Sequence, residues 1–192
     1  MNDETSDLIA KLKLIFEPSS IAFLGATSNP FKWGFRIFAN IVNGGYQGRL
    51  YPVNPTKQEI LGIKVYKNVS EIPEIPDLAI IVIPPPAVPK VLQECADKGI
   101  KSVIVITAGF AEVDTEGEKR QQEMAEIAHS AGLRFIGPNT DGIVNTHHKL
   151  YAEMPPIFPF CRSRLYSLPE REHSGNHDAN VHRQRLRLRQ MH

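Results

Sequence analysis

The chain has 192 residues, with 22 Lys plus Arg against 21 Asp plus Glu, and 42% of its residues are hydrophobic. A formal net charge of +1 excludes a protein that is basic or acidic throughout, and this apolar content excludes disorder along the whole chain. With only Cys95 and Cys161, the chain holds neither a disulfide framework nor a cysteine-rich zinc site. No apolar run approaches the ~20 residues that cross a bilayer. Because the acidic start is unlike a signal peptide, we expect a cytoplasmic protein.

The composition changes near Phe160. Residues 160–192 contain seven Arg, no Lys and three acidic residues, whereas acidic residues outnumber basic ones before them. Four of the seven histidines also lie in this last part. We therefore predict an N-terminal helix over 1–16, an α/β domain over 17–150, a linker over 151–159 and a disordered tail over 160–192.

Apolar runs alternate with segments of helical periodicity in the first part. In chain order, we predict a helix at 6–16, a strand at 21–24, a helix at 35–42, strands at 49–53, 63–66 and 78–83, a helix at 87–98, a strand at 102–106, a helix at 116–131 and a strand at 134–137. This alternation predicts a Rossmann-like, doubly wound, mostly parallel sheet with helices on both faces. Such sheets bind ligands beyond the carboxyl ends of their strands, so the loops that follow the strands are the candidates for a site.

The loop after the first strand is typical of a phosphate site. Gly25 allows a sharp turn, and a helix start follows whose free N–H groups and dipole favour an anion. The loop is neither a G-x-G-x-x-G motif nor a P-loop, so a purely structural glycine turn stays open as the alternative. The candidate binding residues here are Gly25, Ala26, Thr27, Ser28, Lys32 and Gly34.

The loop after residues 49–53 lacks the acidic residue that usually binds the ribose of NAD. Asn54 and Lys57 stand there instead, and an ammonium group attracts a phosphorylated ribose. The alternative is a turn made rigid by Pro55 with a solvated lysine. We take Val53, Asn54, Pro55 and Lys57 as candidates, and they favour a phosphorylated adenosine over plain NAD.

The remaining loops after the strands carry small, proline and amide residues. The prolines that begin at Pro84 form a rigid apolar wall for an adenine or a pantetheine arm, or else only a stiff connection to the next helix. Thr107 and Ala108 allow a close approach, and Asn139 is a candidate anchor. No acid–base pair or Ser-His-Asp trio appears among these loops, and the adjacent pair His147-His148 favours solvated surface over a metal site. We therefore predict a binding edge with no catalytic and no metal-ligating residue.

Five ordered blocks, residues 21–27, 51–55, 82–86, 107–110 and 136–139, resemble the N-terminal CoA-binding domain of the NDP-forming acyl-CoA synthetases. That family includes ADP-forming acetate–CoA ligase and the α subunit of succinyl-CoA synthetase, and the resemblance covers about residues 17–158. It implies a domain that binds coenzyme A (CoA), with the CoA phosphates at the Gly25–Thr27 turn and the following helix start. It also implies that Lys57 contacts CoA and that two segments line it: Ile83, Pro84 and Pro85, and Ile106, Thr107 and Ala108.

The chain departs from this family in two ways. Thr140 and Asp141 stand where the family often has Cys and a small residue. The second domain of complete members, which carries a phosphorylated histidine, and the ATP-grasp part have no counterpart here. The resemblance therefore implies a fragment of an ADP-forming acyl-CoA synthetase that needs a missing domain or subunit as its partner. A stand-alone regulatory CoA-binding module and an NAD(H)-binding oxidoreductase or redox sensor stay open as alternatives.

The tail after Phe160 suggests a shifted reading frame. Permissible codons for Tyr166 to Ser174, read one base later, encode Ile-Val-Ser-Gln-Ser-Gly-Asn-Ile, which resembles the next strand and turn of the family. We therefore hypothesise a lost or gained base near codon 160. Two alternatives are an Arg-rich arm for a nucleic acid or a membrane surface, and a metal site formed by the scattered histidines. Neither explains the change in composition, so we expect no nucleic-acid and no membrane partner.

Overall fold

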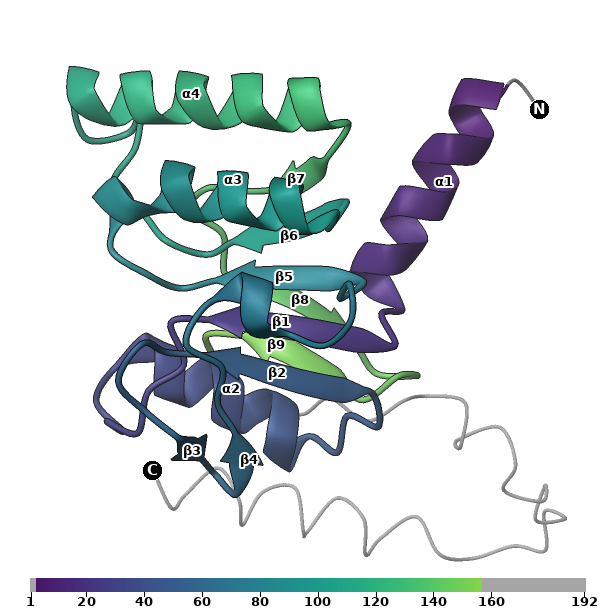
Figure 1. Cartoon of the computed structure of the whole chain (residues 1–192), viewed down its shortest axis with the longest axis vertical. Coiled ribbons are helices and arrows are strands. Elements are labelled where there is room, and N and C mark those ends of the chain that lie inside the picture. Colours follow the sequence, from purple (N-terminus) through teal and green to yellow (C-terminus); the bar gives the residue numbers. More distant parts are fainter. Residues whose placement is uncertain (1–2, 157–192) are drawn as a thin grey trace, which may run out of the picture. The chain divides into compact units, whose positions relative to one another are not determined.

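The computed structural model describes residues 3–156, which are coloured in Figure 1. The predicted disordered tail over 160–192, the end of the predicted linker and Cys161 lie outside the described residues, as does the segment with the shifted-frame resemblance.

Five parallel strands form the central sheet (Figure 1). Their order in the sheet is β2-β1-β5-β6-β7, and each neighbouring pair is parallel. The strands are β1 Ser20–Leu24, β2 Arg49–Val53, β5 Leu78–Ile81, β6 Ser102–Val105 and β7 Arg134–Ile136. All residues of β1, β5 and β6 are buried, as their apolar, β-branched sequences require of strands covered on both faces. The predicted Rossmann-like parallel sheet is therefore confirmed.

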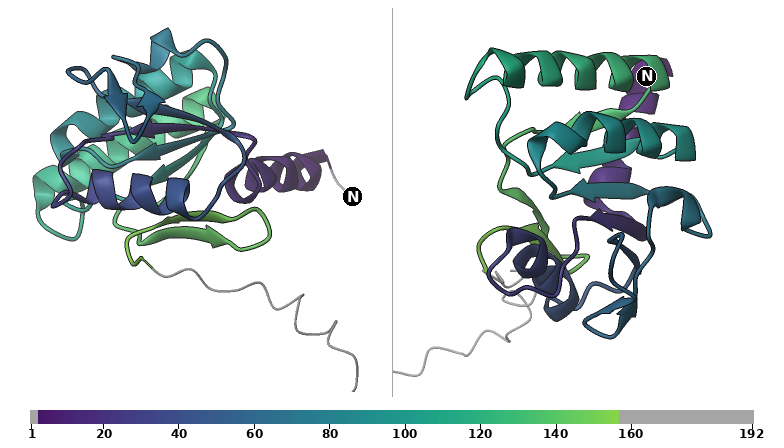
Figure 2. Two further views of the ribbon diagram at one scale, coloured as in Figure 1. Left: turned by 90° about the horizontal axis from the view of Figure 1, so that it is seen from below. Right: turned by 60° about the vertical axis from the view of Figure 1, so that its left-hand side comes forward.

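Helices cover both faces of this sheet, and alternate strand residues face each layer (Figures 1 and 2). Ala22 and Leu24 of β1 belong to the cluster that includes α3 Val88–Lys98 and α4 Thr115–Ala131. Ile21 and Phe23 belong to the other cluster, which includes α2 Trp33–Asn43 and the end of α1 Asp3–Phe16. The sheet thus has the two covered faces that the alternation predicted. No helix among residues 3–156 is long and apolar enough to span a membrane.

Glycines end α3 and α4 where the sequence predicted. Gly99 (φ 92°) and Gly132 (φ 62°) adopt the left-handed conformation, and the N–H group of each bonds back to the last turn of its helix. At the start of α4, the Asp114 side chain accepts a hydrogen bond from Gly117 N at 2.7 Å. Short 3₁₀ turns, η1 Val69–Glu71 and η2 Pro85–Ala87, complete the connections.

The structure differs from the prediction in two short segments. The predicted strand at 63–66 is only β4 Ile63–Lys64, which pairs antiparallel with β3 Glu59–Ile60 outside the main sheet, while Tyr66 makes a single bridge to Val53. The other difference is an unpredicted antiparallel hairpin of β8 Gly142–Asn145 and β9 Leu150–Glu153.

This hairpin corrects the predicted start of the linker at residue 151. Leu150 and Ala152 are fully buried in the cluster that includes α2. Asn40 of α2 is itself buried, and its Nδ2 donates to Glu153 O at 2.9 Å and to Pro155 O at 3.3 Å. Because its side chains pack into the core cluster that includes α2, the hairpin is part of the domain.

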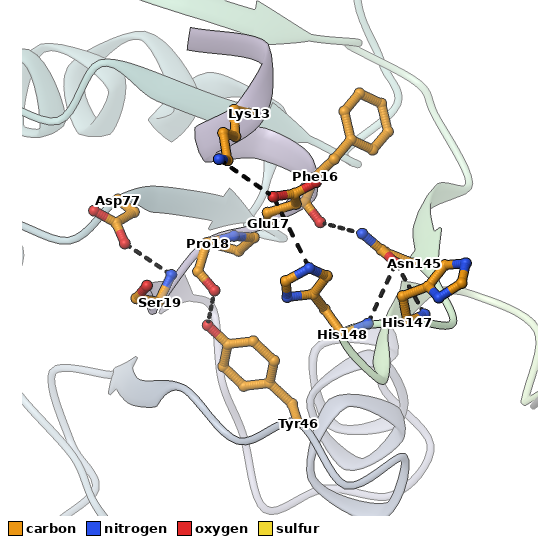
Figure 3. A network of polar contacts seen from close by, with 10 residues as sticks. All are labelled: Lys13, Phe16, Glu17, Pro18, Ser19, Tyr46, Asp77, Asn145, His147 and His148. Carbon is orange, nitrogen blue, oxygen red and sulfur yellow. Dashed lines mark hydrogen bonds and ion pairs between the residues drawn. The ribbon is translucent and has the colours of Figure 1, made fainter. Parts of the chain in front are cut away.

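Hydrogen bonds connect neighbouring segments at the amino edge of the sheet, where β1 begins (Figure 3). Ser19 N donates to an Asp77 carboxylate oxygen at 2.8 Å, and Asp77 N donates in turn to Ser20 Oγ at 3.0 Å. Tyr46, which follows α2, donates its hydroxyl to Pro18 O at 2.7 Å. These bonds fix the start of β1 between β5 and the end of α2.

The turn of the hairpin joins the same network. Asn145 Nδ2 donates to Phe16 O, the last residue of α1, at 2.8 Å, and Asn145 Oδ1 accepts from the backbone N–H groups of His147 and His148. Figure 3 shows His148 turned toward Glu17, with 3.9 Å between Nε2 and Oε2. The hairpin turn is thereby attached to the junction between α1 and β1.

Candidate functional site

The chain reverses its direction across the sheet between β1 and β5. In doubly wound sheets the loops diverge at such a point and leave a crevice at the carboxyl edge. Gly25, directly after β1, has φ +98°, and a Cβ there would lie 2.0 Å from Val82 O. A Cβ at Gly34 would lie 2.1 Å from Gly25 O. Only glycine fits at these positions, so the start of α2 packs directly against the turn after β1.

A cavity of about 590 Å³ lies in this crevice, within the usual size range of ligand sites. It brings together residues from all five loops that the sequence singled out. The predicted residues that line it are Gly25, Thr27, Lys32, Gly34, Asn54, Pro55, Ile83, Pro84, Ile106, Thr107, Ala108 and Asn139.

Five predicted residues do not line the cavity. Ala26 is fully buried and Val53 is 8% exposed, so both belong to the core beneath it. Ser28 and Lys57 are exposed outside the cavity wall. Pro85 lies beside Gly109, where a Cβ would be 2.7 Å from Pro85 Cγ, so it supports the contact between two loops. Neighbouring residues of a loop face different ways, and the sequence blocks did not distinguish them.

Asn54 lines the cavity, but its amide joins two loops. Its Nδ2 donates to Ala26 O at 2.7 Å, and its Oδ1 accepts from Thr56 N at 2.9 Å and from Thr56 Oγ1 at 3.0 Å. The side chain therefore fixes the loop after β1 onto the loop after β2. Asn54 is a positioning residue for the site.

Thr107 does the same for the loops after β5 and β6. Its hydroxyl donates to Ile83 O at 2.8 Å and accepts from Ile83 N at 3.2 Å. Thr107 O also accepts from Asn139 N at 2.9 Å, which attaches the loop after β7. The Glu112 carboxylate accepts from Gly109 N at 2.7 Å, and this bond is the main cause that lowers the pKa of Glu112. The loops around the cavity are thus held before any ligand binds.

Some polar groups at the cavity are left available for a ligand. Lys32 is the residue directly before α2, and its side chain makes no capping hydrogen bond to the helix. The first turn of α2 contains no acidic residue. Lys32 also lines the cavity, and no acidic residue does so within the described part of the chain. The side-chain amide of Asn139 makes no hydrogen bond to any of residues 3–156. A helix N-terminus beside a cation favours an anion such as a phosphate.

Apart from the Lys32 ammonium, the cavity walls formed by residues 3–156 contain no titratable side chain. The other wall residues are apolar or small, and threonine hydroxyls are the only oxygen–hydrogen groups among them. Cys95 is fully buried on α3, and burial raises the pKa of its thiol to about 12, so it is an inert core thiol. Within residues 3–156, no three His, Cys, Asp or Glu side chains gather as a metal site requires.

Trp33, Val82 and Met154 also line the cavity, although they were not among the predicted site residues. Trp33 is the first residue of α2, so its place between the glycine turn and Gly34 was a usable signal. Val82 follows β5 directly and was assigned to the strand itself. Met154 follows β9, and no signal pointed to it because the hairpin was not predicted.

Residues 19–146 match the family model of the CoA-binding domain. The chain is 49% identical over 142 residues to subunit alpha of the ADP-forming acetate–CoA ligase II of Pyrococcus furiosus, a match that covers 73% of this chain and 31% of that subunit. It is also 44% identical over 149 residues to the ADP-forming acetate–CoA ligase of Methanocaldococcus jannaschii. This match covers 78% of this chain and 21% of that protein.

A solved structure shows the same likeness. The acetyl-coenzyme A synthetase 1 of Candidatus Korarchaeum cryptofilum, in complex with phosphate and ADP, matches with a TM-score of 0.73 and 38% identity over 77% of this chain and 32% of that one. The chain thus spans about a third or less of the length of these relatives. It belongs to the CoA-binding domain family and is homologous to the N-terminal part of the ADP-forming acyl-CoA synthetases.

Proposed function

We propose that the cavity at the carboxyl edge of the sheet binds CoA. The observation that carries this proposal is the start of α2, which has no side-chain cap and no acidic residue and lies beside Lys32 at the wall of the cavity. These groups suit the pyrophosphate of CoA, and the Asn139 amide is available for a further polar contact. Ile83, Pro84 and Ile106 offer the apolar surface that an adenine ring or a pantetheine arm requires.

Lys57 is proposed to meet the 3′-phosphate of CoA. It is exposed on the turn after β2, close in sequence to the wall residues Asn54 and Pro55. A lysine is a point charge on a flexible stem, so its ammonium group is able to approach a phosphate that extends beyond the rim. This role belongs to the ligand-bound state.

We further propose that the chain is the CoA-binding part of an ADP-forming acyl-CoA synthetase, which interconverts acyl-CoA, ADP and phosphate with a carboxylate, CoA and ATP. The described histidines are unsuited to carry a phosphoryl group to the cavity: His147 and His148 lie at the opposite edge of the sheet, and His129 lies on α4 outside the cavity wall. The chain is therefore expected to form no acyl-CoA until a further domain or subunit supplies that chemistry. We place this activity in the cytoplasm.

Calorimetry with CoA, dephospho-CoA and NADH tests the proposal. CoA is expected to bind about fivefold more tightly than dephospho-CoA, since one exposed ion pair contributes up to ~1 kcal/mol. Lys57→Ala should remove this preference and reduce the salt dependence of binding. Lys90→Ala, an exposed lysine of α3, is the matched control and should change neither. Binding of NADH alone would establish the oxidoreductase alternative, and acyl-CoA formation by the purified chain would contradict the need for a partner.

The reading-frame hypothesis belongs to this proposal, because the relatives continue well beyond the matched region. Sequencing the genomic DNA around codon 160 tests it. We expect a one-base shift to restore coding for a family-like second domain. An intact frame, with no family-like sequence in either shifted frame, would reject the hypothesis and favour the stand-alone CoA-binding module.

A further inference from the structure

A second cavity, also of about 590 Å³, adjoins the proposed CoA cavity beside α2. Trp33 and Met154 line both cavities, so they form a shared wall between the two. The other residues around the second cavity are Pro30, Phe35, Arg36, Ala39, Asn40, Asp141, Pro155 and Pro156. The two cavities therefore adjoin at the side chains of Trp33 and Met154.

The second cavity is predominantly apolar, and two of its polar side chains, Arg36 and Asn40, are bonded within the domain. Arg36 Nε donates to Pro30 O at 3.2 Å, and its guanidinium carbon lies 5.1 Å from the centroid of the Trp33 ring. The Asn40 amide donates to the carbonyls of Glu153 and Pro155. What remains for a ligand is mainly hydrocarbon and aromatic surface, from Trp33, Phe35, Ala39, Met154 and the prolines.

Charge at this cavity disfavours an anionic ligand group. Asp141 lies in the wall, and Glu153 is the paired residue of Gly142 in the adjoining hairpin. Burial, and after it the charge of Asp141, raises the pKa of the Glu153 carboxyl. A further carboxylate at this wall would meet the charge of Asp141 and would be buried against apolar surface, which is costly for a charged group. The Arg36 guanidinium also lines the cavity and keeps its charge over the Trp33 ring, so the preference for an uncharged group rests on Asp141 and on the apolar wall.

We propose that the second cavity receives the acyl group of an acyl-CoA whose nucleotide occupies the first cavity, and that it prefers uncharged, apolar acyl groups. The inference rests on the proposed function, because it needs CoA in the first cavity. It adds that the CoA-binding part of the enzyme itself contacts the acyl group and contributes to the choice of substrate.

Binding of CoA, acetyl-, butyryl-, hexanoyl- and succinyl-CoA to the purified chain tests the inference. Trp33 is the only tryptophan and is 48% exposed, so its fluorescence reports on both cavities and supplements calorimetry. Affinity should rise from acetyl- to hexanoyl-CoA by up to about fourfold per methylene group, the limit for full burial. Succinyl-CoA should bind more weakly than butyryl-CoA, which has the same number of acyl carbons.

Two variants on α2 locate the effect. Ala39→Phe should fill the second cavity and remove the dependence on chain length, while the affinity for CoA stays unchanged. Asn43→Phe places the same side chain one turn further along the exposed surface of α2, outside the cavity, and should preserve the dependence. Equal affinities for all the thioesters, with CoA still bound, would overturn the inference alone and favour coverage of this cavity by a partner domain. No binding of CoA would overturn it together with the proposed function.

Discussion

The two edges of the central sheet use similar polar groups in opposite ways. At the amino edge, Asp77, Tyr46 and Asn145 bind backbone groups of the junction between α1 and β1 and close it (Figure 3). At the carboxyl edge, Asn54 and Thr107 join the loops around a cavity to one another, and the start of α2 has no side-chain cap. One edge thus stabilises the domain, and the other combines joined loops with a helix start that has no side-chain cap.

The largest effect is expected at Gly25, where the carboxyl edge depends on a position that only glycine fits. Gly25→Ala would put a methyl group 2.0 Å from Val82 O at φ +98° and should lower the free energy of unfolding by about 3 kcal/mol or more, measured by urea denaturation. Gly62 has φ +77° but nothing within 4 Å of a Cβ, so Gly62→Ala should cost only about 1 kcal/mol. Equal losses for the two variants would contradict the close approach of the turn after β1 to Val82.

The amino edge should affect stability without affecting binding. Asp77→Ala leaves Ser19 N without its charged acceptor and should lower the free energy of unfolding by about 1.5 kcal/mol. The affinity for CoA should stay unchanged in calorimetry. Asp97, which pairs with Gln93 on the exposed surface of α3, is the matched control, and Asp97→Ala should cost less than about 0.5 kcal/mol. A loss of CoA affinity in Asp77→Ala would show that the two edges are coupled.

Substitutions of Thr107 should affect both the stability of the domain and its affinity for CoA, because Thr107 stabilises a loop that lines the cavity. Thr107→Val keeps the shape of the side chain but loses both bonds to Ile83, at a cost of about 1 kcal/mol in unfolding free energy. We expect a severalfold loss of CoA affinity with it. Thr107→Ser retains the hydroxyl and should restore binding. If Thr107→Ser binds as weakly as Thr107→Val, the hydroxyl alone does not position the loop, and the methyl group is needed as well.

The smallest effect is expected from pH at the exposed Glu112. Its folded pKa lies below the ordinary value of 4.5, chiefly because Gly109 N donates to the carboxylate. The resulting stability is fully present above that ordinary value and is lost as the pH falls through the folded pKa. Melting temperatures between pH 3 and 6 should therefore fall less steeply for Glu112→Gln than for the unaltered chain. Parallel curves would show that this bond contributes nothing measurable.

The sequence was informative where a structural role needs a distinctive residue type. Runs such as residues 78–81 predicted the central strands, and Gly25 and Asn139 marked loops that do reach the cavity. The hairpin was missed because each of its strands has four residues and its turn contains no glycine or proline. Met154 was missed with it. The side chains of Ala26 and Val53 are buried beneath the cavity, which a sequence block does not reveal, so their contact with a ligand stays a prediction.

The packing of β9 on α2 has a consequence for how the domain forms during translation. Asn40 finds its acceptors only in Glu153 and Pro155, more than a hundred residues later in the chain. Until those residues leave the ribosome, the apolar surface of α2 that β9 covers has no partner, even though β1 and β2 were made long before. Part of the core surface of α2 therefore stays uncovered until late in the synthesis of the domain.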